Sequence, residues 1–195
     1  MTGKKAAVSI LLILIAGLGA LAVWLHAHGF SAREEPAWYE KMLARHVRRI
    51  VTPAGAKALR NPHPLTEESL PAAREHWVAH RSSCHALDGS GNTTIGRNLY
   101  PKAPDMRDME TQKMSDGELY YIISNGVRFT GMPAWGGEDS PQSIWELVAF
   151  IRRLPQLSAQ EKELMERMAR GEGEQKTPGA AKTHSHAPGT PPHKH

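Results

Sequence analysis

The longest apolar run of the chain lies near its amino terminus. Residues 6–25 contain no charged side chain, and Lys4 and Lys5 precede them. Twenty residues at the helical rise span about 30 Å, the thickness of a bilayer's hydrocarbon core, whereas the apolar core of a signal peptide usually has about 7 to 15. We therefore predict an uncleaved transmembrane anchor over residues 1–28, with Trp24 near the outer interface. Cleavage near residues 30–32 is the alternative, and in both cases the rest of the chain is exported.

A second hydrophobic pattern follows at residues 36–51. Apolar and basic residues recur there at helical spacing, which predicts a short amphipathic helix. The apolar members are Trp38, Met42, Leu43, Val47, Ile50 and Val51, and the basic members are Arg45, His46, Arg48 and Arg49. We expect residues 29–65 to form a juxtamembrane helix and a linker, with the basic side chains resting on anionic head groups. A specific partner site is the alternative.

Residues 66–157 carry three further helical patterns separated by loops. The first begins at Thr66 or Ser69 and places Ala73, Trp77 and Arg81 along one side. Residues 115–118 read as a capping box that opens the second helix, which Gly126 ends. Ser140 and Pro141 begin the third. The proline-rich segment 98–107 predicts non-helical chain between the first two.

The carboxyl-terminal part of the chain is polar. Residues 158–170 predict one more helix, and residues 171–195 are rich in Gly, Pro, Lys and Thr, which is typical of a disordered tail. Four histidines occur in this tail, at positions 184, 186, 193 and 195. Clustered histidines can capture metal weakly, so metal binding by the tail stays open as an alternative to a flexible extension.

The charge distribution gives no support to nucleic-acid binding. The formal net charge is +4, but residues 71–155 carry nine Lys or Arg against ten Asp or Glu, and the excess of positive charge lies in residues 1–70. A nucleic-acid-binding domain would concentrate basic residues on its own surface. Cys84 is the sole cysteine, so the chain has no intramolecular disulfide.

The sole cysteine stands directly before a histidine, in the segment Arg81-Ser82-Ser83-Cys84-His85, and Asp88-Gly89-Ser90-Gly91 follows. This is the end of a C-x-x-C-H haem attachment motif whose first cysteine is replaced by Arg81. A thiol can add to a haem vinyl group to form a thioether, and the neighbouring imidazole can then bind the iron. Met132 lies in a loop that Gly131 and Pro133 keep non-helical, so its sulfur is a candidate for the sixth iron position.

Residues from about 70 to 155 resemble a class I cytochrome c domain. Five features match this family in the right order: Trp77 in the first helix, residues 88–91 after the haem motif, residues 95–99, the Met132 loop, and residues 147–151 in the last helix. The resemblance implies an all-α domain around one haem c, attached through Cys84 by a single thioether. It further implies His85 as the proximal and Met132 as the distal iron ligand.

The resemblance also implies the wider haem environment. The backbone carbonyl at Arg97 is the implied acceptor for the axial histidine, and Trp135 belongs to the implied cofactor-binding loop. Arg97, Arg107 and Arg128 are candidates to pair with haem propionates, with solvent exposure as the alternative for each. Met106, Met109 and Met114 compete with Met132 as sulfur donors, although methionine by default fills core space. His76 and His80 are expected to face solvent.

Together these features predict a membrane-anchored bacterial monohaem cytochrome that carries single electrons, either alone or as a subunit of an oxidoreductase. The expected location is the outer, periplasmic side of the cytoplasmic membrane, with membrane lipid and redox proteins as partners. No arrangement of acid, base and nucleophile predicts an enzyme that turns over a substrate. The alternatives are a haem-free domain of the same fold that serves for docking, and a metal-capturing protein that works through its histidine tail.

Overall fold

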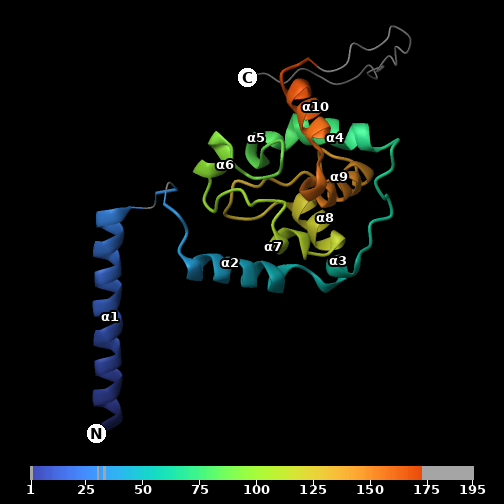
Figure 1. Cartoon of the computed structure of the whole chain (residues 1–195). Helices are drawn as coiled ribbons and strands as arrows, with labels where there is room; N and C mark the ends of the chain where they lie inside the picture. Colours follow the sequence, from blue (N-terminus) through green and yellow to red (C-terminus); the bar gives the residue numbers. More distant parts are fainter. Residues whose placement is uncertain (1, 30, 33, 173–195) are drawn as a thin grey trace, which may run out of the picture.

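The computed structural model describes residues 2–29, 31–32 and 34–172, and all regular structure in these residues is helical. The prediction of an all-α chain is therefore confirmed for the described part (Figure 1). The helices are α1 (Thr2–His28), α2 (Trp38–Val51), α3 (Ala54–Ala58), α4 (Leu70–His80), α5 (Ser82–His85), α6 (Thr94–Asn98), α7 (Met109–Gln112), α8 (Asp116–Asn125), α9 (Pro141–Arg153), the 3-10 turn η1 (Leu154–Gln156) and α10 (Ala159–Ala169).

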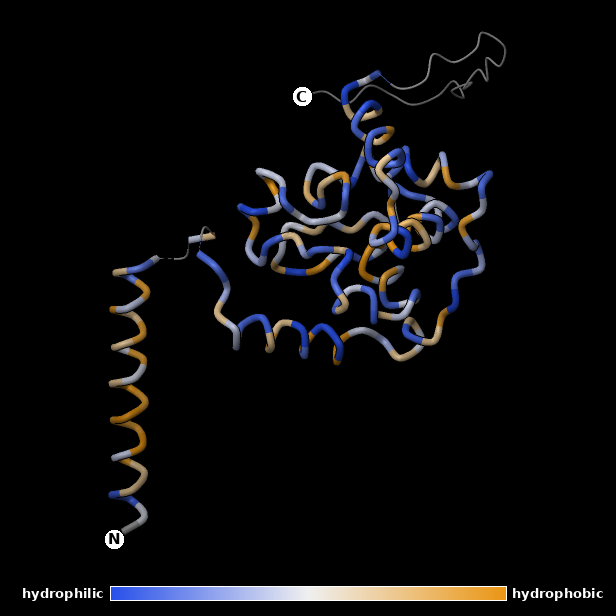
Figure 2. The backbone as a smooth tube through the Cα atoms, in the orientation of Figure 1, coloured by the Kyte–Doolittle hydropathy of each residue, from blue (hydrophilic) through white to orange (hydrophobic). Residues whose placement is uncertain are grey.

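Helix α1 is the predicted apolar segment. Its residues 3–28 are long and apolar enough to cross a membrane, and none of that span is buried inside the protein. Figure 2 shows the hydrophobic residues along most of its length, in contrast to the domain, where they lie mainly inside. The helix therefore fits a single-pass anchor by length and composition.

The core of the domain forms where α4, α8 and α9 meet. Trp77 on α4 and Phe150 on α9 are both fully buried, and their ring centroids lie 5.9 Å apart. Ala73, Trp77 and Arg81 are buried along one side of the first helical segment, as the sequence predicts. The buried apolar residues of the core are Leu70, Ala73, Trp77, Leu119, Ile123, Ile144, Trp145, Leu147, Val148, Phe150, Ile151, Leu154, Leu157 and Met165.

Side-chain caps fix where the later helices begin. In α8 the Ser115 hydroxyl accepts from the Glu118 amide while the Glu118 carboxylate accepts from the Ser115 amide, which confirms the predicted capping box. Ser140 caps α9 in the predicted way, and its hydroxyl accepts from the Ser143 amide. These bonds satisfy backbone donors that each helix would otherwise leave unpaired.

Two segments outside the predicted domain bounds pack against it. Helix α3, within the predicted linker, lies against α8, where Ala56 approaches Gly117 so closely that a Cβ on this glycine would lie 1.9 Å from the Ala56 carbonyl oxygen. Helix α10 packs on α4 and inserts Met165, which is fully buried. The predicted disordered tail lies outside the described residues from position 173 onward.

Candidate functional site

A largely apolar cavity opens between the α4–α5 corner, α8 and the loops of residues 99–104 and 127–135. It contains about 1000 Å³ of atom-free space, with its open mouth included. The apolar side chains in its wall come from several separate segments of the chain. They are Leu99, Pro101, Ala103, Pro104, Met106, Met114, Leu119, Ile122, Ile123, Val127, Met132, Pro133, Trp135 and Ile151.

One wall of the cavity, here called the proximal wall, carries the Cys84-His85 pair. A break in the helix at Arg81 separates α4 from α5, and the four residues of α5 present both side chains to the cavity. The His85 carbonyl then accepts from the Gly91 amide at 2.8 Å, which closes the turn after the motif. Sequence reasoning thus locates the segment, and the helix break explains how it enters the cavity.

Trp77 holds the chain immediately after His85. Its indole Nε1 donates to the carbonyls of Ala86 and Leu87, at 3.2 and 3.0 Å. Ala86 has a φ of 65°, a left-handed conformation that costs a residue with a Cβ on the order of 1 kcal/mol or more. The two indole contacts therefore stabilise a turn that an alanine would not adopt by itself.

The imidazole of His85 is held neutral. It is 7% exposed, and burial lowers its pKa from the ordinary 6.5 to about 4; the backbone of Pro104 acts in the opposite direction, and the charge of Arg81 lowers the pKa further. Its Nδ1 atom is buried without a hydrogen bond of normal geometry to any described residue. A neutral imidazole in an apolar wall suits metal coordination, because only the deprotonated ring nitrogen can bind a metal.

Arg81, at the position of the missing cysteine, is buried and forms part of the cavity wall. Its side chain is 4% exposed, its Nη2 donates to the Asp139 carboxylate, and its guanidinium carbon lies 3.8 Å from the ring centroid of Trp135. The pKa of Arg81 is lowered by burial and raised by Asp139. Its Nε and Nη1 are buried without a partner among the described residues. Arg81 thus links the proximal wall to the loop that follows Met132.

Of the two histidines of α4, only His76 departs from the expectation that both face solvent. The side chain of His76 is 15% exposed, with Nε2 3.3 Å from Asp139 Oδ2 and 3.4 Å from Arg81 Nη2. Burial lowers the pKa of His76 and Asp139 raises it, with a net lowering. His80 is exposed, as expected, and borders the cavity. The sequence gives no sign of this cluster because Asp139 is distant from α4 along the chain.

The opposite, distal wall is the loop that carries Met132. Two backbone hydrogen bonds attach this loop to the end of α8. The Trp135 amide donates to the Ile123 carbonyl at 3.1 Å, and the Gly136 amide donates to the Ser124 carbonyl at 2.9 Å. The Met132 amide donates to Thr130 Oγ1, and the Met132 carbonyl accepts from the Val127 amide. Met132 is half-buried and lines the cavity. The fold therefore brings Met132 to the same cavity as Cys84 and His85.

The competing methionines divide into two groups. Met106 and Met114 also line the cavity, whereas Met109 is 67% exposed and does not. The Met106 amide donates to the Gly89 carbonyl at 2.7 Å, so Met106 is tied to the loop that follows His85. Met106 therefore belongs to the same wall as His85, and Met132 to the other.

The cations that line the cavity are not the arginines named above as candidate propionate partners. Arg97 is exposed and donates to Asn92 Oδ1, and Arg128 is exposed outside the cavity wall. Arg107 pairs with Asp88 and Asp105. The backbone beside the His85 imidazole is that of Pro104 rather than that of Arg97. After α6 the chain turns back, and the Ala103 amide donates to the Gly96 carbonyl at 3.0 Å.

Arg48 and Lys102 line the cavity instead, together with Arg81. Arg48 comes from α2, outside the predicted domain, and its pKa is lowered by burial against the raising effect of Glu118. Lys102 pairs with Glu35, in the segment before α2. The juxtamembrane segment therefore supplies part of the site, which its basic, amphipathic pattern alone does not reveal.

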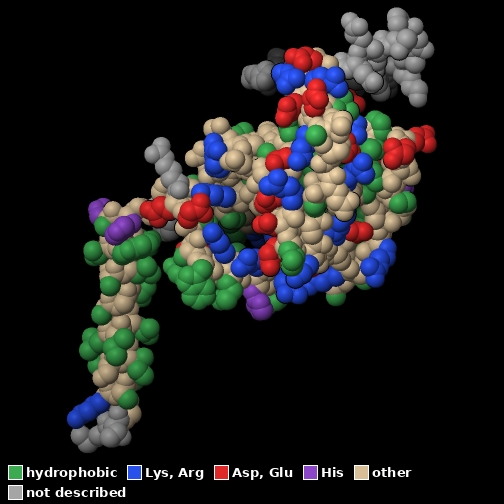
Figure 3. Space-filling model, viewed as in Figure 1, with side chains coloured by type: hydrophobic (Ala, Val, Ile, Leu, Met, Phe, Trp, Pro, Cys, Tyr) green, Lys and Arg blue, Asp and Glu red, His purple; other side chains and the backbone are tan. Residues whose placement is uncertain are grey.

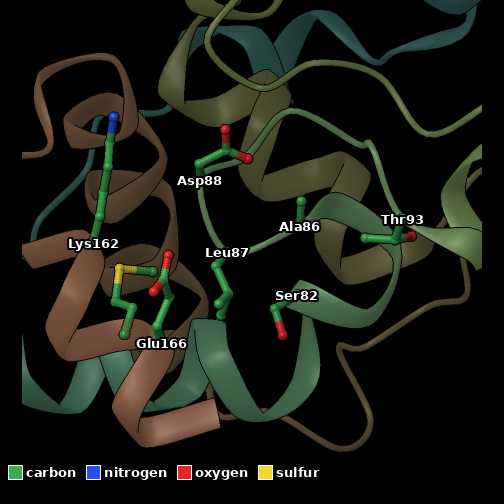
Figure 4. Close-up of a pocket in the computed structure, with 8 residues that line it drawn as sticks. Ser82, Ala86, Leu87, Asp88, Thr93, Lys162 and Glu166 are labelled. Atoms are coloured by element: carbon green, nitrogen blue, oxygen red, sulfur yellow. The ribbon is translucent and has the colours of Figure 1, made fainter. Parts of the chain in front are cut away.

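A second hollow lies behind the motif, between α5 and α10 (Figure 4). Met165 forms part of its wall, and Lys162 and Glu166 on α10 are exposed beside it. The part of the chain that the structure describes contains no group of three or more His, Cys, Asp or Glu side chains able to hold a metal ion. The metal-binding alternative for the histidine tail lies outside the described residues.

The family comparison agrees with the resemblance drawn from the motifs. Residues 68–151 match the family model described as cytochrome c oxidase, cbb3-type, subunit III. This match supports a c-type cytochrome family and a role in electron transfer for this part of the chain, which carries the Cys84-His85 pair and Met132. No curated protein matches the chain significantly.

Proposed function

We propose that this chain is a membrane-anchored monohaem c-type cytochrome that carries single electrons and turns over no substrate of its own. The observation that carries the proposal is the convergence of Cys84, His85 and Met132 from separate segments on one apolar cavity. An apolar wall with a few placed polar groups is typical of a cofactor site. The family match over residues 68–151 supports haem c as the cofactor.

The residues present fit a haem group. Bound haem supplies a reversible one-electron couple at its iron, whose potential depends on axial ligands and burial. Cys84 would hold the ring covalently, with one thioether rather than two, because Arg81 occupies the other position. His85 would bind the iron as the proximal ligand, since burial keeps its imidazole neutral.

Met132 is proposed as the distal ligand. It lies in the wall opposite the His85 segment, whereas Met106 is tied by its backbone to the loop after His85. A thioether sulfur favours reduced iron and raises the potential. Met114 also lines the cavity and is the main competitor within the described residues.

Arg48 and Lys102 are proposed to pair with the haem propionates in place of Arg97 and Arg128. Both line the cavity, and Arg48 has no carboxylate within 4 Å among the described residues. A partly buried cation gains from an anionic partner that enters with the ligand. Trp135 would pack beside the ring, as the resemblance implies, while its other contact is the Arg81 guanidinium.

The location and partners follow from α1 and from the family match. We propose that α1 anchors the protein in the cytoplasmic membrane with the haem domain on the periplasmic side, as the lysines before the apolar run favour. The partners would then be redox proteins of that membrane, of the kind that the name of the matching family indicates.

A haem stain after denaturing electrophoresis tests covalent attachment. Protein made in a host with c-type cytochrome maturation should stain, and Cys84→Ser should not. The reduced pyridine complex should show the band position of one thioether, and Arg81→Cys, which restores two cysteines, should move it toward that of two. A colourless wild-type protein would favour the haem-free docking domain, for which the buried Arg81–Asp139 pair is the supporting feature.

Three methionine variants test the distal ligand. The oxidised wild-type protein should show the charge-transfer band of a sulfur–iron bond. Met132→Ala should lose this band, whereas Met106→Ala and Met114→Ala should keep it. The assignment is wrong if the band survives in Met132→Ala or disappears in Met114→Ala alone.

A further inference from the structure

Helix α2 exposes a row of large apolar side chains that nothing in the described structure covers. Its outward face consists of Trp38, Tyr39, Met42, Leu43, His46 and Ile50. Of these, Trp38, Leu43 and Ile50 are 74%, 61% and 70% exposed. Figure 3 shows hydrophobic side chains gathered over the beginning of α2, with a histidine and Lys or Arg side chains beyond them.

The polar side of α2, not the apolar side, faces the domain. Glu40 accepts from the Tyr100 hydroxyl, Arg48 lines the cavity, and Arg45 lies 4.0 Å from Glu110 of α7. A surface helix normally turns its apolar stripe toward its own core. The reversed orientation of α2 leaves the outward face without a partner in this chain.

We propose that the outward face of α2 lies in the head-group region of the membrane in which α1 anchors the chain. Only nine residues separate α1 from α2, and nine extended residues reach at most about 30 Å. Helix α2 is therefore held close to the bilayer surface. Amphipathic helices of this kind bury their apolar face about 5–10 Å into the interface. The inference rests on the proposed anchoring by α1 but not on haem.

Charge favours an anionic lipid surface over a second copy of the chain. Arg49 borders the outward face and has no ion pair among the described residues, whereas Lys41 and Arg45 pair with Glu35 and Glu110; each Lys or Arg near an anionic membrane surface contributes about 1 kcal/mol to binding. Two copies of α2 packed face to face would bring the two Arg49 side chains toward each other. The outward face itself contains no acidic residue.

Docking of α2 would also determine which side of the cavity faces the membrane. The loop of residues 99–104 lines the cavity and is tied to the α2 segment through Tyr100–Glu40 and Lys102–Glu35. With α2 at the membrane surface, this loop lies next to the bilayer. Electron exchange with partners in the plane of the membrane would be favoured over exchange with partners that approach from bulk solution.

Photo-crosslinking in vesicles of phosphatidylethanolamine and phosphatidylglycerol tests the proposal with the full chain. The photoreactive residue p-benzoylphenylalanine is placed in turn at position 14 in α1, position 43 on the outward face, and position 75 in α4. Position 75 is exposed, and α4 lies on the side of the domain away from α2 (Figure 1). We expect lipid adducts from positions 14 and 43, and none above background from position 75.

The outcomes separate the anchor from the docking face. Lipid adducts from position 14 without adducts from position 43 would overturn docking by α2 and leave the anchor intact. Absence of adducts from position 14 would overturn the anchor and with it this proposal. Adducts of position 43 with a second copy of the chain or with another membrane protein, in place of lipid, would also overturn it.

A matched pair of variants tests the apolar side chains directly. With the probe at position 42, the change Leu43→Glu with Ile50→Glu should abolish the lipid adduct, because both side chains are exposed and the change leaves the core intact. The control Glu163→Ser with Glu166→Ser, on exposed positions of α10, should keep it. An adduct that survives the double glutamate variant would show that apolar insertion does not hold α2 to the membrane.

Discussion

The two walls of the cavity are held in different ways. The proximal wall depends on helix packing: His85 is 7% exposed, and the turn after it is fixed by the fully buried Trp77. The distal wall is an irregular loop held by backbone hydrogen bonds to the end of α8 and within itself, and Met132 in it is only half-buried. A haem site built in this way would have a rigid histidine side and a methionine side that a local change can open.

Arg81 is the connection between the two walls. In the expected motif this position would hold a second thioether on the proximal side. Here its side chain reaches across to Asp139 and Trp135, in the chain that follows Met132. At this position the chain has an ion pair between the walls, where the motif would have a cysteine within one of them. Four experiments test how these parts of the site are held.

The largest effect is expected from Trp77→Ala, which breaks the proximal wall. Removal of a fully buried tryptophan leaves a cavity and takes the indole donor from the Leu87 carbonyl, and should lower the free energy of unfolding by about 3–5 kcal/mol. Urea unfolding followed by circular dichroism measures this loss. Trp38→Ala, at a position 74% exposed, should change it by less than about 0.5 kcal/mol. Equal losses in both variants would contradict the buried role of Trp77.

The next effect is expected from Arg81→Met, which cuts the connection between the walls. The loss should be about 3 kcal/mol, at the low end for a broken buried ion pair, because His76 stays beside Asp139. The double variant Arg81→Met with Asp139→Asn should cost less than the sum of the two single variants, since the single changes leave a charge unpaired. Strict additivity in this cycle would show that the two side chains do not interact.

A smaller effect is expected from Gly126→Ala, which disturbs the distal wall. Gly126 has a φ of 65°, and a Cβ there would lie 2.6 Å from the Pro133 carbonyl carbon and 2.7 Å from the Met132 carbonyl oxygen. The strain should cost about 1–3 kcal/mol. In haem-loaded protein the variant should keep its covalent haem but lose the sulfur–iron band.

Gly137→Ala is the matched control for this loop. Nothing lies within 4 Å of a Cβ at this position, and its backbone is not in the left-handed region. The control should therefore keep both the stability and the band. Loss of the band in both variants would mean that the loop does not tolerate change in general, rather than that Gly126 sets the place of Met132.

The smallest effect concerns the pH dependence of stability that comes from Asp105 and Arg107, in the loop before α7. Arg107 lowers the pKa of Asp105, first through a side-chain hydrogen bond, below its ordinary 3.8. Because this pKa is lowered in the folded protein, the stabilisation is present above pH 3.8 and is lost as the pH falls through the lowered value. The pairs are partly exposed, so the loss should stay below about 1 kcal/mol.

Urea unfolding of wild-type protein and Arg107→Gln at pH 6 and at pH 3 measures this effect. The variant should be less stable than wild type at pH 6, and the gap should narrow at pH 3. Arg97→Gln is the control, since Arg97 is exposed and contacts Asn92 rather than a carboxylate. A gap of the same size at both pH values would rule out the ionised Asp105 as its source.

Short-range sequence patterns determine much of the secondary structure. The apolar run of α1, the caps at Ser115 and Ser140 and the spacing of Ala73, Trp77 and Arg81 each depend on residues within a few turns, so their positions follow from helical periodicity and capping chemistry. The Cys84-His85 pair is likewise adjacent in the chain. For this reason the sequence alone locates the fold class, the long apolar helix and the segment that would attach haem.

Tertiary structure decided what these segments meet. Arg81 contacts Asp139, Arg48 enters the cavity from a helix that the sequence places outside the domain, and Pro104 rather than Arg97 lies beside His85. These contacts join residues far apart in the chain, and helical periodicity carries no information about such pairs. The same holds for α2: its pattern predicts an amphipathic helix, but only the packing of the domain determines that its apolar side faces outward.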